Sequence, residues 1–289
     1  MRRRDYLKLI SAAALASPAV RAAVVPKGRF RPALCAYSFR NQLTAKTMSY
    51  ADVIRLAADL GADGVDLTTY WLGDGDDGTL FALKKLAYRS AIALYTIGIR
   101  ARMAQPTADL QAGEVEKVRK WLDVAEKLGS SHIRIFGGAV PKGATEDQAV
   151  VWAVETLKRC AEPASSKGIT LGLEDDGGIT TTAQRTVEIV EKTGSPWVGI
   201  NLDIGNFRDD AYRQIEMCAP YATNVHFKAL IHVNQQSQPP DSSRILGILG
   251  KAGYHGYLAL EYESPEDPLS EVPKLLSQMR QAIRVANES

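Results

Sequence analysis

Five places along the sequence share one joint, in which a helical pattern ends at a glycine and a β-branched apolar run follows. The pairs are Gly61 before 64–67, Gly129 before 133–136, Gly168 before 169–174, Gly194 before 198–203 and Gly253 before 257–261. Glycine ends a helix readily because it adopts positive φ without steric cost. A serial alternation of helix and strand builds a parallel sheet, which must be covered on both faces or closed.

Further apolar runs bring the expected set to eight strands and eight helices. The added strands are 31–40, 92–100 and 224–230, and the helices are 49–60, 79–90, 108–128, 145–167, 182–193, 209–218, 242–252 and 269–286. Eight such units predict an α/β fold, a single (β/α)8 TIM barrel over residues 23–289. A doubly wound open sheet is the alternative, but the first strand leads into Tyr37 without the GxGxxG fingerprint of that fold. The polar stretch 233–241 is expected to be a long loop on the active-site side.

The first 22 residues carry a different pattern. The motif RRDYLK at 3–8 resembles the twin-arginine export consensus, and the Ala-rich run 9–20 that follows it ends in small residues. We therefore predict a twin-arginine-type signal peptide over 1–22, recognition by the twin-arginine export machinery and a periplasmic location in a bacterium. The apolar run is too short and too weakly apolar for a stable membrane span. The alternative is a basic amphipathic start that stays attached.

Charge and cysteine usage exclude several classes of protein. Residues 1–22 hold five basic side chains and one acidic one, so the formal net charge of +2 becomes −2 without them. No basic surface for a nucleic acid is therefore expected. The three cysteines, Cys35, Cys160 and Cys218, form no CxxC pair, so neither a disulfide framework nor a zinc cluster is indicated.

Four successive strands of the expected barrel carry a carboxylate or an imidazole near their C-terminal ends. These side chains are Glu174, Asp203, His226 and Glu261. Neighbours in this set are separated by about one βαβ unit of roughly 30 residues. Because the C-terminal ends of barrel strands meet at one rim, we expect the four side chains to converge. The alternative is four unrelated polar strand ends that cap helices or face water.

Three converging carboxylates repel one another unless a cation lies between them. The sequence therefore predicts one divalent metal ion, held by Glu174, Asp203, His226 and Glu261. Oxygen ligands with a single imidazole suit Mn²⁺ best, with Mg²⁺, Co²⁺, Fe²⁺ or Zn²⁺ as alternatives.

The same stretches resemble the xylose isomerase-like TIM barrels, the sugar phosphate isomerase/epimerase group. The resemblance covers nearly all of residues 23–289 and rests on LGLE at 171–174, NLD at 201–203, VHFK at 225–228 and the strand that ends at Glu261. It implies that the four residues bind one divalent metal and that Glu174 and Glu261 also act as acid and base. Asp175 and Asp176 replace the Asn-His that often follows the first ligand in this family.

Four residues are expected to contact substrate. Lys228 lies on the same strand face as His226, and Arg134 is expected to face the mouth of the barrel, although either cation can instead pair with an acid. Asn206 and His232 stand where ketose epimerases of the resembled family carry His and Arg.

Five other polar or aromatic residues are assigned structural roles. His132 and His255 are expected at the opposite rim, whereas Tyr70, Trp71 and Phe207 are expected to pack in the core rather than stack on a sugar.

The expected reaction is isomerisation or epimerisation of a sugar or oxidised sugar derivative, by removal of a proton next to a carbonyl through an ene-diolate. A metal-dependent lyase or hydrolase acting on 3-keto-glycosides is the first alternative, and predicted export favours it. A non-catalytic sugar-binding barrel is the second alternative. A trinuclear zinc endonuclease is disfavoured because the chain has only four histidines. The remaining candidate partner is a second copy of the chain, in a homo-oligomer.

Overall fold

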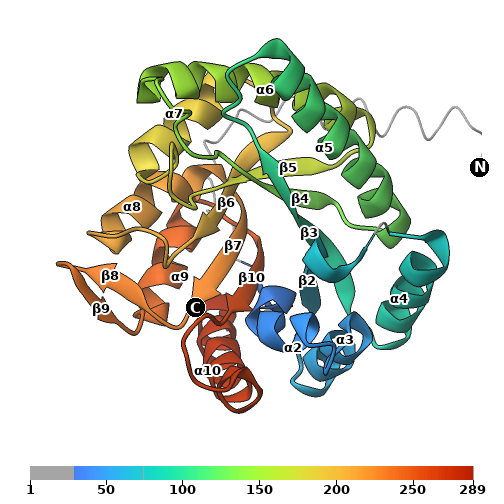
Figure 1. The fold of residues 1–289 in the computed structure, drawn as a ribbon. Helices are drawn as coiled ribbons and strands as arrows, with labels where there is room; N and C mark the ends of the chain where they lie inside the picture. The colour runs from blue at the N-terminus through green and yellow to red at the C-terminus, as the bar shows by residue number, and fades with distance from the viewer. Residues whose placement is uncertain (1–28, 74, 289) are drawn as a thin grey trace, which may run out of the picture.

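Eight parallel strands close into a barrel in the computed structural model, which describes residues 29–73 and 75–288 (Figure 1). Around the barrel the strands follow the order β1-β10-β7-β6-β5-β4-β3-β2. Their bounds are β1 (Phe30–Cys35), β2 (Gly64–Thr68), β3 (Ala93–Arg102), β4 (His132–Phe136), β5 (Thr170–Glu174), β6 (Val198–Asp203), β7 (Ala222–Lys228) and β10 (Gly256–Glu261). The predicted TIM barrel is confirmed, whereas the predicted signal peptide 1–22 lies outside the described residues.

Helices form a ring outside the strands (Figure 1). They are α3 (Tyr50–Asp59), α4 (Asp77–Arg89), α5 (Ala108–Leu128), α6 (Glu146–Ser166), α7 (Ala183–Thr193), α8 (Ala211–Cys218), α9 (Ser242–Lys251) and α10 (Pro268–Glu288). The helix α10 completes the ring by packing against β1. No helix in the described part of the chain is long and apolar enough to cross a membrane.

The predicted joints form for the expected reason. Gly129 and Gly194 are the C-caps of α5 and α7, with φ of 84° and 65° in the left-handed region. The helix starts are also specified locally, since Ser49 and Thr145 form capping boxes with Asp52 and Gln148. Short stretches of sequence therefore determine where the helices and strands alternate.

Two segments differ from the sequence prediction. The first strand ends at Cys35, and a 3-10 helix η1 (Ala36–Phe39) and the short helix α2 (Arg40–Thr44) follow it. Ser38 holds this turn against the end of β10, because its Oγ donates to Leu260 O and accepts from Tyr262 N.

The stretch predicted as a long polar loop contains a hairpin of β8 (Ile231–Val233) and β9 (Gln236–Gln238). Its two turn residues, Asn234 and Gln235, have φ of 50° and 60°. Two consecutive positive φ values match the twist of a two-residue hairpin, and asparagine accepts that conformation readily. The backbone conformation of these two turn residues therefore allows the hairpin, although the polarity of the stretch suggested a loop.

The interior of the barrel is unusually polar. Its small apolar cluster consists of Ala33, Cys35 and Ala259, against which Tyr95 and Tyr257 pack. The two tyrosine rings stack with their centroids 3.8 Å apart. Buried polar side chains lie on the strands β2, β3, β4, β6 and β7, and they are Asp66, Thr96, His132, Arg134, Asn201, Asn224 and His226. An interior of this kind must satisfy its polar groups internally.

Gly172 in β5 is required by this interior packing. A Cβ at this position would lie 2.3 Å from His132 Nε2 and 3.1 Å from Asn201 Cβ. His132 cannot move aside easily because its ring is buried and bonded to Thr96 Oγ1 at 2.7 Å and Thr223 Oγ1 at 3.1 Å. We expect Gly172→Ala to lower the free energy of unfolding by about 1–3 kcal/mol in urea denaturation.

Gly247→Ala in α9 is the matched control, because a Cβ there meets nothing within 4 Å. Alanine in place of an unhindered helical glycine is expected to stabilise the protein by about 0.5–1 kcal/mol. Equal urea midpoints for Gly172→Ala and the unsubstituted protein would contradict the steric argument.

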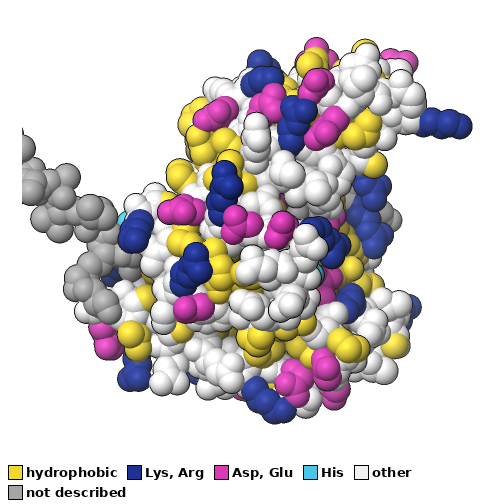
Figure 2. All heavy atoms as spheres, turned by 90° about the vertical axis from the view of Figure 1, so that its left-hand side faces the viewer, with side chains coloured by type: hydrophobic (Ala, Val, Ile, Leu, Met, Phe, Trp, Pro, Cys, Tyr) yellow, Lys and Arg dark blue, Asp and Glu magenta, His cyan; other side chains and the backbone are white. Residues whose placement is uncertain are grey.

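One face of the molecule mixes the two signs of charge. Figure 2 shows acidic and basic side chains interspersed over the face that it presents.

Candidate metal centre and substrate cavity

Four buried side chains meet where the strands β5, β6, β7 and β10 end. They are Glu174, Asp203, His226 and Glu261, and one ligand atom from each lies within 4.8 Å of the others. Three of them are the last residues of their strands, and His226 pairs in register with Asp203. The structure therefore brings together the four side chains that the sequence singled out.

The carboxylates surround one nitrogen of the imidazole. His226 Nδ1 lies 3.0 Å from Glu174 Oε1, 3.3 Å from Glu261 Oε2 and 3.7 Å from Asp203 Oδ2. Asp203 Oδ2 is buried without a hydrogen-bond partner among the described residues, although Lys228 Nζ forms an ion pair with it at 3.1 Å. Three carboxylates and one imidazole nitrogen directed at one point fit a divalent cation.

Electrostatics show how strongly this cluster attracts positive charge. Burial by itself lowers the pKa of His226, yet the negative charge of Glu261 and the nearby carboxylates of Asp203, Asp66 and Glu174 hold it well above its usual range. Burial by itself raises the pKa of Glu261, but the charges of Lys228 and His226 hold it well below its usual range. A proton on His226 thus supplies positive charge to the cluster, as a bound cation would.

Both predicted cationic contacts pair with acids of the cluster. Lys228 is 7% exposed, and its Nζ lies 2.6 Å from Glu261 Oε2 and also forms an ion pair with Glu263. Arg134 Nε lies 3.4 Å from Glu174 Oε2. The sequence left open whether each cation contacts substrate or pairs with an acid, and in the structure each one pairs with an acid.

A cavity of about 100 Å³ opens above the cluster. It is lined by Tyr37, Tyr70, Arg134, Phe136, Glu174, Asp176, Asp203, Asn206, Lys228, Glu261 and Glu263. Asn206 lies in this wall, as does Tyr70, which the sequence placed in the core. Phe207 is fully buried in the core as expected, and the partly buried Trp71 packs against the hydrophobic core.

His232 does not line this cavity. It lies on β8, and its Nε2 is 3.1 Å from Ser237 Oγ across the hairpin. The hairpin pairing, which the sequence did not predict, directs the ring toward β9. His132 is buried at the start of β4, and His255 Nδ1 accepts a hydrogen bond from Arg29 N, so neither reaches the cluster.

Several side chains that sequence reasoning missed support the cluster from below. Asn201 Nδ2 donates to Glu174 Oε1 at 3.0 Å, and Asn224 Nδ2 donates to Asn201 Oδ1 at 2.7 Å. Asp66 Oδ2 lies 2.7 Å from His226 Nε2. A signal was available for the two asparagines, because each stands two residues before a cluster member and so shares its strand face.

Asp175, next to Glu174, has a separate role. It is buried, and its Oδ1 accepts a hydrogen bond from Asp203 N at 2.8 Å. Burial and the nearby charge of Asp203 raise the pKa of Asp175 well above its usual range. This residue therefore holds the backbone at the end of β6 and does not enter the cavity.

Comparison with known proteins matches the same part of the chain. The family model of the xylose isomerase-like TIM barrel matches residues 54–284. Among solved structures, D-psicose 3-epimerase from Clostridium cellulolyticum H10, solved with D-tagatose, is similar with a TM-score of 0.69 and 18% identity, over 89% of this chain and 96% of that one. No curated protein matches the chain.

Two further solved structures extend the comparison. The IolI protein with a bound zinc atom is similar with a TM-score of 0.70 and 14% identity, over 89% of this chain and 98% of that one. The probable 3-DHS dehydratase AsbF from Bacillus anthracis is similar with a TM-score of 0.64 and 16% identity, over 88% and 98%. At these identities the likeness is one of fold.

Proposed function

We propose, on the premise that this chain belongs to the xylose isomerase-like TIM barrel family, that it is a divalent-metal-dependent sugar isomerase or epimerase. One observation carries the proposal. The ligand atoms of Glu174, Asp203, His226 and Glu261 lie within 4.8 Å of one another at the base of a cavity. Sugar epimerases among the similar structures support the same reading.

The same four side chains would hold the metal ion. A cation held there would supply positive charge that offsets the negative charge developing when a proton next to a carbonyl is removed. The donor set favours Mn²⁺, and the zinc atom of the IolI structure supports a divalent ion of this class.

The two glutamates are the acid and base of the proposed reaction. Glu174 ends β5 and Glu261 ends β10, so they approach the cavity from strands separated by β6 and β7. Lys228 and His226 keep Glu261 ionised, as the group that accepts a proton must be. Return of the proton to the opposite face by the second glutamate gives an epimer, and return to the neighbouring carbon gives an isomer.

The cavity favours an uncharged substrate. Arg134 and Lys228, the two cations that line it among the described residues, are already paired with Glu174 on one side and with Glu261 and Glu263 on the other. A phosphate would meet more carboxylate than free cation, and like charges placed together cost several kcal/mol. The rings of Tyr37 and Tyr70 offer apolar surface to the C–H faces of a sugar.

A panel of free and phosphorylated ketoses and 3-keto-glycosides in D₂O, combined with metal analysis, tests the proposal. We expect about one cation per chain and deuterium at the carbon next to the carbonyl. We also expect kcat/KM for a free sugar to be at least about tenfold above that for its phosphate, because of the repulsion described above.

Other outcomes identify the alternatives. Sugar binding without deuterium exchange refutes an isomerase and indicates a non-catalytic barrel. Release of the aglycone from a 3-keto-glycoside, without epimer or isomer, identifies a lyase or hydrolase.

A further inference from the structure

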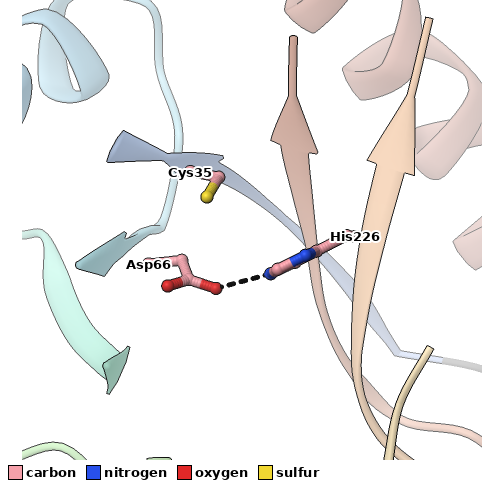
Figure 3. A group of neighbouring side chains, drawn as sticks. All are labelled: Cys35, Asp66 and His226. Atoms are coloured by element: carbon pink, nitrogen blue, oxygen red, sulfur yellow. Dashed lines mark hydrogen bonds and ion pairs between the residues drawn. The ribbon is translucent and has the colours of Figure 1, made fainter. Parts of the chain in front are cut away.

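The imidazole of His226 is held on both of its nitrogens. Nδ1 faces the carboxylates of the metal cluster, whereas Nε2 lies 2.7 Å from Asp66 Oδ2 (Figure 3). The side chains of both residues are 1% exposed. Water therefore does not compete with this contact, and the ring cannot turn without breaking it.

Asp66 reaches this position across the interior of the barrel. It belongs to β2, whereas His226 belongs to β7, and the strands β1 and β10 lie between them on the shorter way around the barrel. A buried carboxylate is costly unless it is paired and hydrogen-bonded. Asp66 has the His226 ring and also Asn224 Nδ2, at 3.4 Å, as donors. An apolar residue would fill a buried strand at lower cost, which points to a role for the carboxylate.

The chemistry of imidazole defines that role. A neutral imidazole carries one N–H, and its other nitrogen offers a lone pair. A carboxylate can only accept, so Asp66 favours the proton on Nε2 and leaves the lone pair of Nδ1 directed at Glu174, Asp203 and Glu261. A carboxylate behind a histidine fixes the tautomer and orientation of a metal ligand in this way.

We propose that Asp66 is a positioning residue, which holds the proton of His226 on Nε2 and thereby presents Nδ1 to a divalent cation. The proposal rests on the metal centre of the proposed function. It concerns how that centre is assembled and not which sugar is converted.

A second cation held by Cys35, Asp66 and His226 is the competing interpretation, since these three side chains lie together (Figure 3). The contact between His226 Nε2 and Asp66 Oδ2 has hydrogen-bond length, and two ligands of one tetrahedral zinc lie about 3.3 Å apart given metal–ligand bonds of about 2.0–2.1 Å. Cys35 Sγ also donates to Glu261 Oε1 at 3.4 Å and not to Asp66. The geometry therefore favours a hydrogen bond over a second metal site.

The remaining polar groups connect Asp66 to a second member of the cluster. Asn224 Nδ2 contacts both Asp66 Oδ2 and Asn201 Oδ1, and Asn201 Nδ2 donates to Glu174 Oε1. One buried network thus orients two of the four proposed ligands. Its loss is expected to affect cation binding before it affects the fold.

The first test measures the dissociation constant for Mn²⁺ in chelator-buffered solutions, with the full chain and its Asp66→Asn variant. We expect Asp66→Asn to bind Mn²⁺ about 10–100-fold more weakly, the usual effect of removing an outer partner of a ligand. Thr96→Val is the matched control. Thr96 is buried in the same interior and hydrogen-bonds His132, the other buried histidine, at 2.7 Å. The affinity of Thr96→Val for Mn²⁺ is therefore expected to stay within about threefold of the wild-type value.

The second test needs no variant. Nitrogen-15 NMR of histidine in the Zn²⁺-loaded protein is expected to show a protonated Nε2 and a metal-bound Nδ1 for His226. A proton on Nδ1, two Zn²⁺ ions per chain, or Mn²⁺ affinity unchanged by Asp66→Asn would each overturn the role of Asp66. A wild-type chain that binds neither ion refutes the metal centre itself, whereas normal wild-type binding with an unchanged variant refutes this inference alone.

Discussion

Replacing Glu174 and Glu261 together by glutamine is expected to abolish deuterium exchange next to the carbonyl. Glutamine keeps the size of each side chain and an oxygen that accepts from Asn201, but it cannot take up a proton at neutral pH. Loss of one acid–base group slows a reaction by about 10²–10⁴-fold. We expect each single variant to fall in that range and the double variant to show no measurable exchange by mass spectrometry.

Metal content separates loss of chemistry from loss of the cation. Each glutamine variant is assayed at saturating Mn²⁺, with the bound metal measured in the same sample. Glu188→Gln is the control, because this carboxylate lies on α7 outside the barrel, in ion pairs with Arg185 and Lys192. Exchange by the metal-loaded double variant at the wild-type rate would remove both glutamates from the mechanism.

Asp203→Asn is expected to remove most of the stabilisation that a divalent ion gives the protein. At a concentration of about 1,000 times its dissociation constant, an ion stabilises the folded wild type by about 4.1 kcal/mol. For domains of about 150–250 residues, each kcal/mol raises Tm by about 2–4 °C. Mn²⁺ is therefore expected to raise the wild-type Tm by roughly 8–16 °C and to leave Asp203→Asn nearly unchanged.

Differential scanning calorimetry with and without Mn²⁺, followed by excess EDTA, measures this effect. Glu188→Gln again serves as the control and is expected to shift with Mn²⁺ as the wild type does. A wild-type Tm that is the same in Mn²⁺ and EDTA would contradict a cation held by the cluster. An equal Mn²⁺ shift in Asp203→Asn would remove Asp203 from the ligand set.

Much of the fold and the location of the site could be predicted before any coordinates. Glycine stops such as Gly129 and Gly194 act within a few residues, and strand polarity places every C-terminal strand end at one rim. The convergence of Glu174 and Glu261 follows from these local rules. The hairpin β8–β9 was missed because its signal lies in two residues of a polar stretch, Asn234 and Gln235.

The hydrogen-bond and ion-pair partners of the interior side chains could not be predicted from the spacing of residues in the sequence. Asp66 and His226 are 160 positions apart, and neither a helical nor a strand period relates them. The ion-pair partners of Lys228 were equally unpredictable. Strand alternation predicts that its side chain points into the barrel, but it does not predict pairing with Asp203, Glu261 or Glu263. His232 was expected to contact substrate from the family resemblance, but its ring contacts Ser237 across the hairpin and does not line the cavity.

The sequence by itself determined the order of the elements, the closed barrel and the rim at which the candidate ligands gather. Periodicity, helix ends and strand direction are properties of short segments, so the chain carries them without reference to its fold. Only the tertiary structure decided which polar groups satisfy one another inside the barrel. That choice arises when closure places β2 opposite β7, excludes water and leaves each buried charge dependent on whichever partner lies within reach.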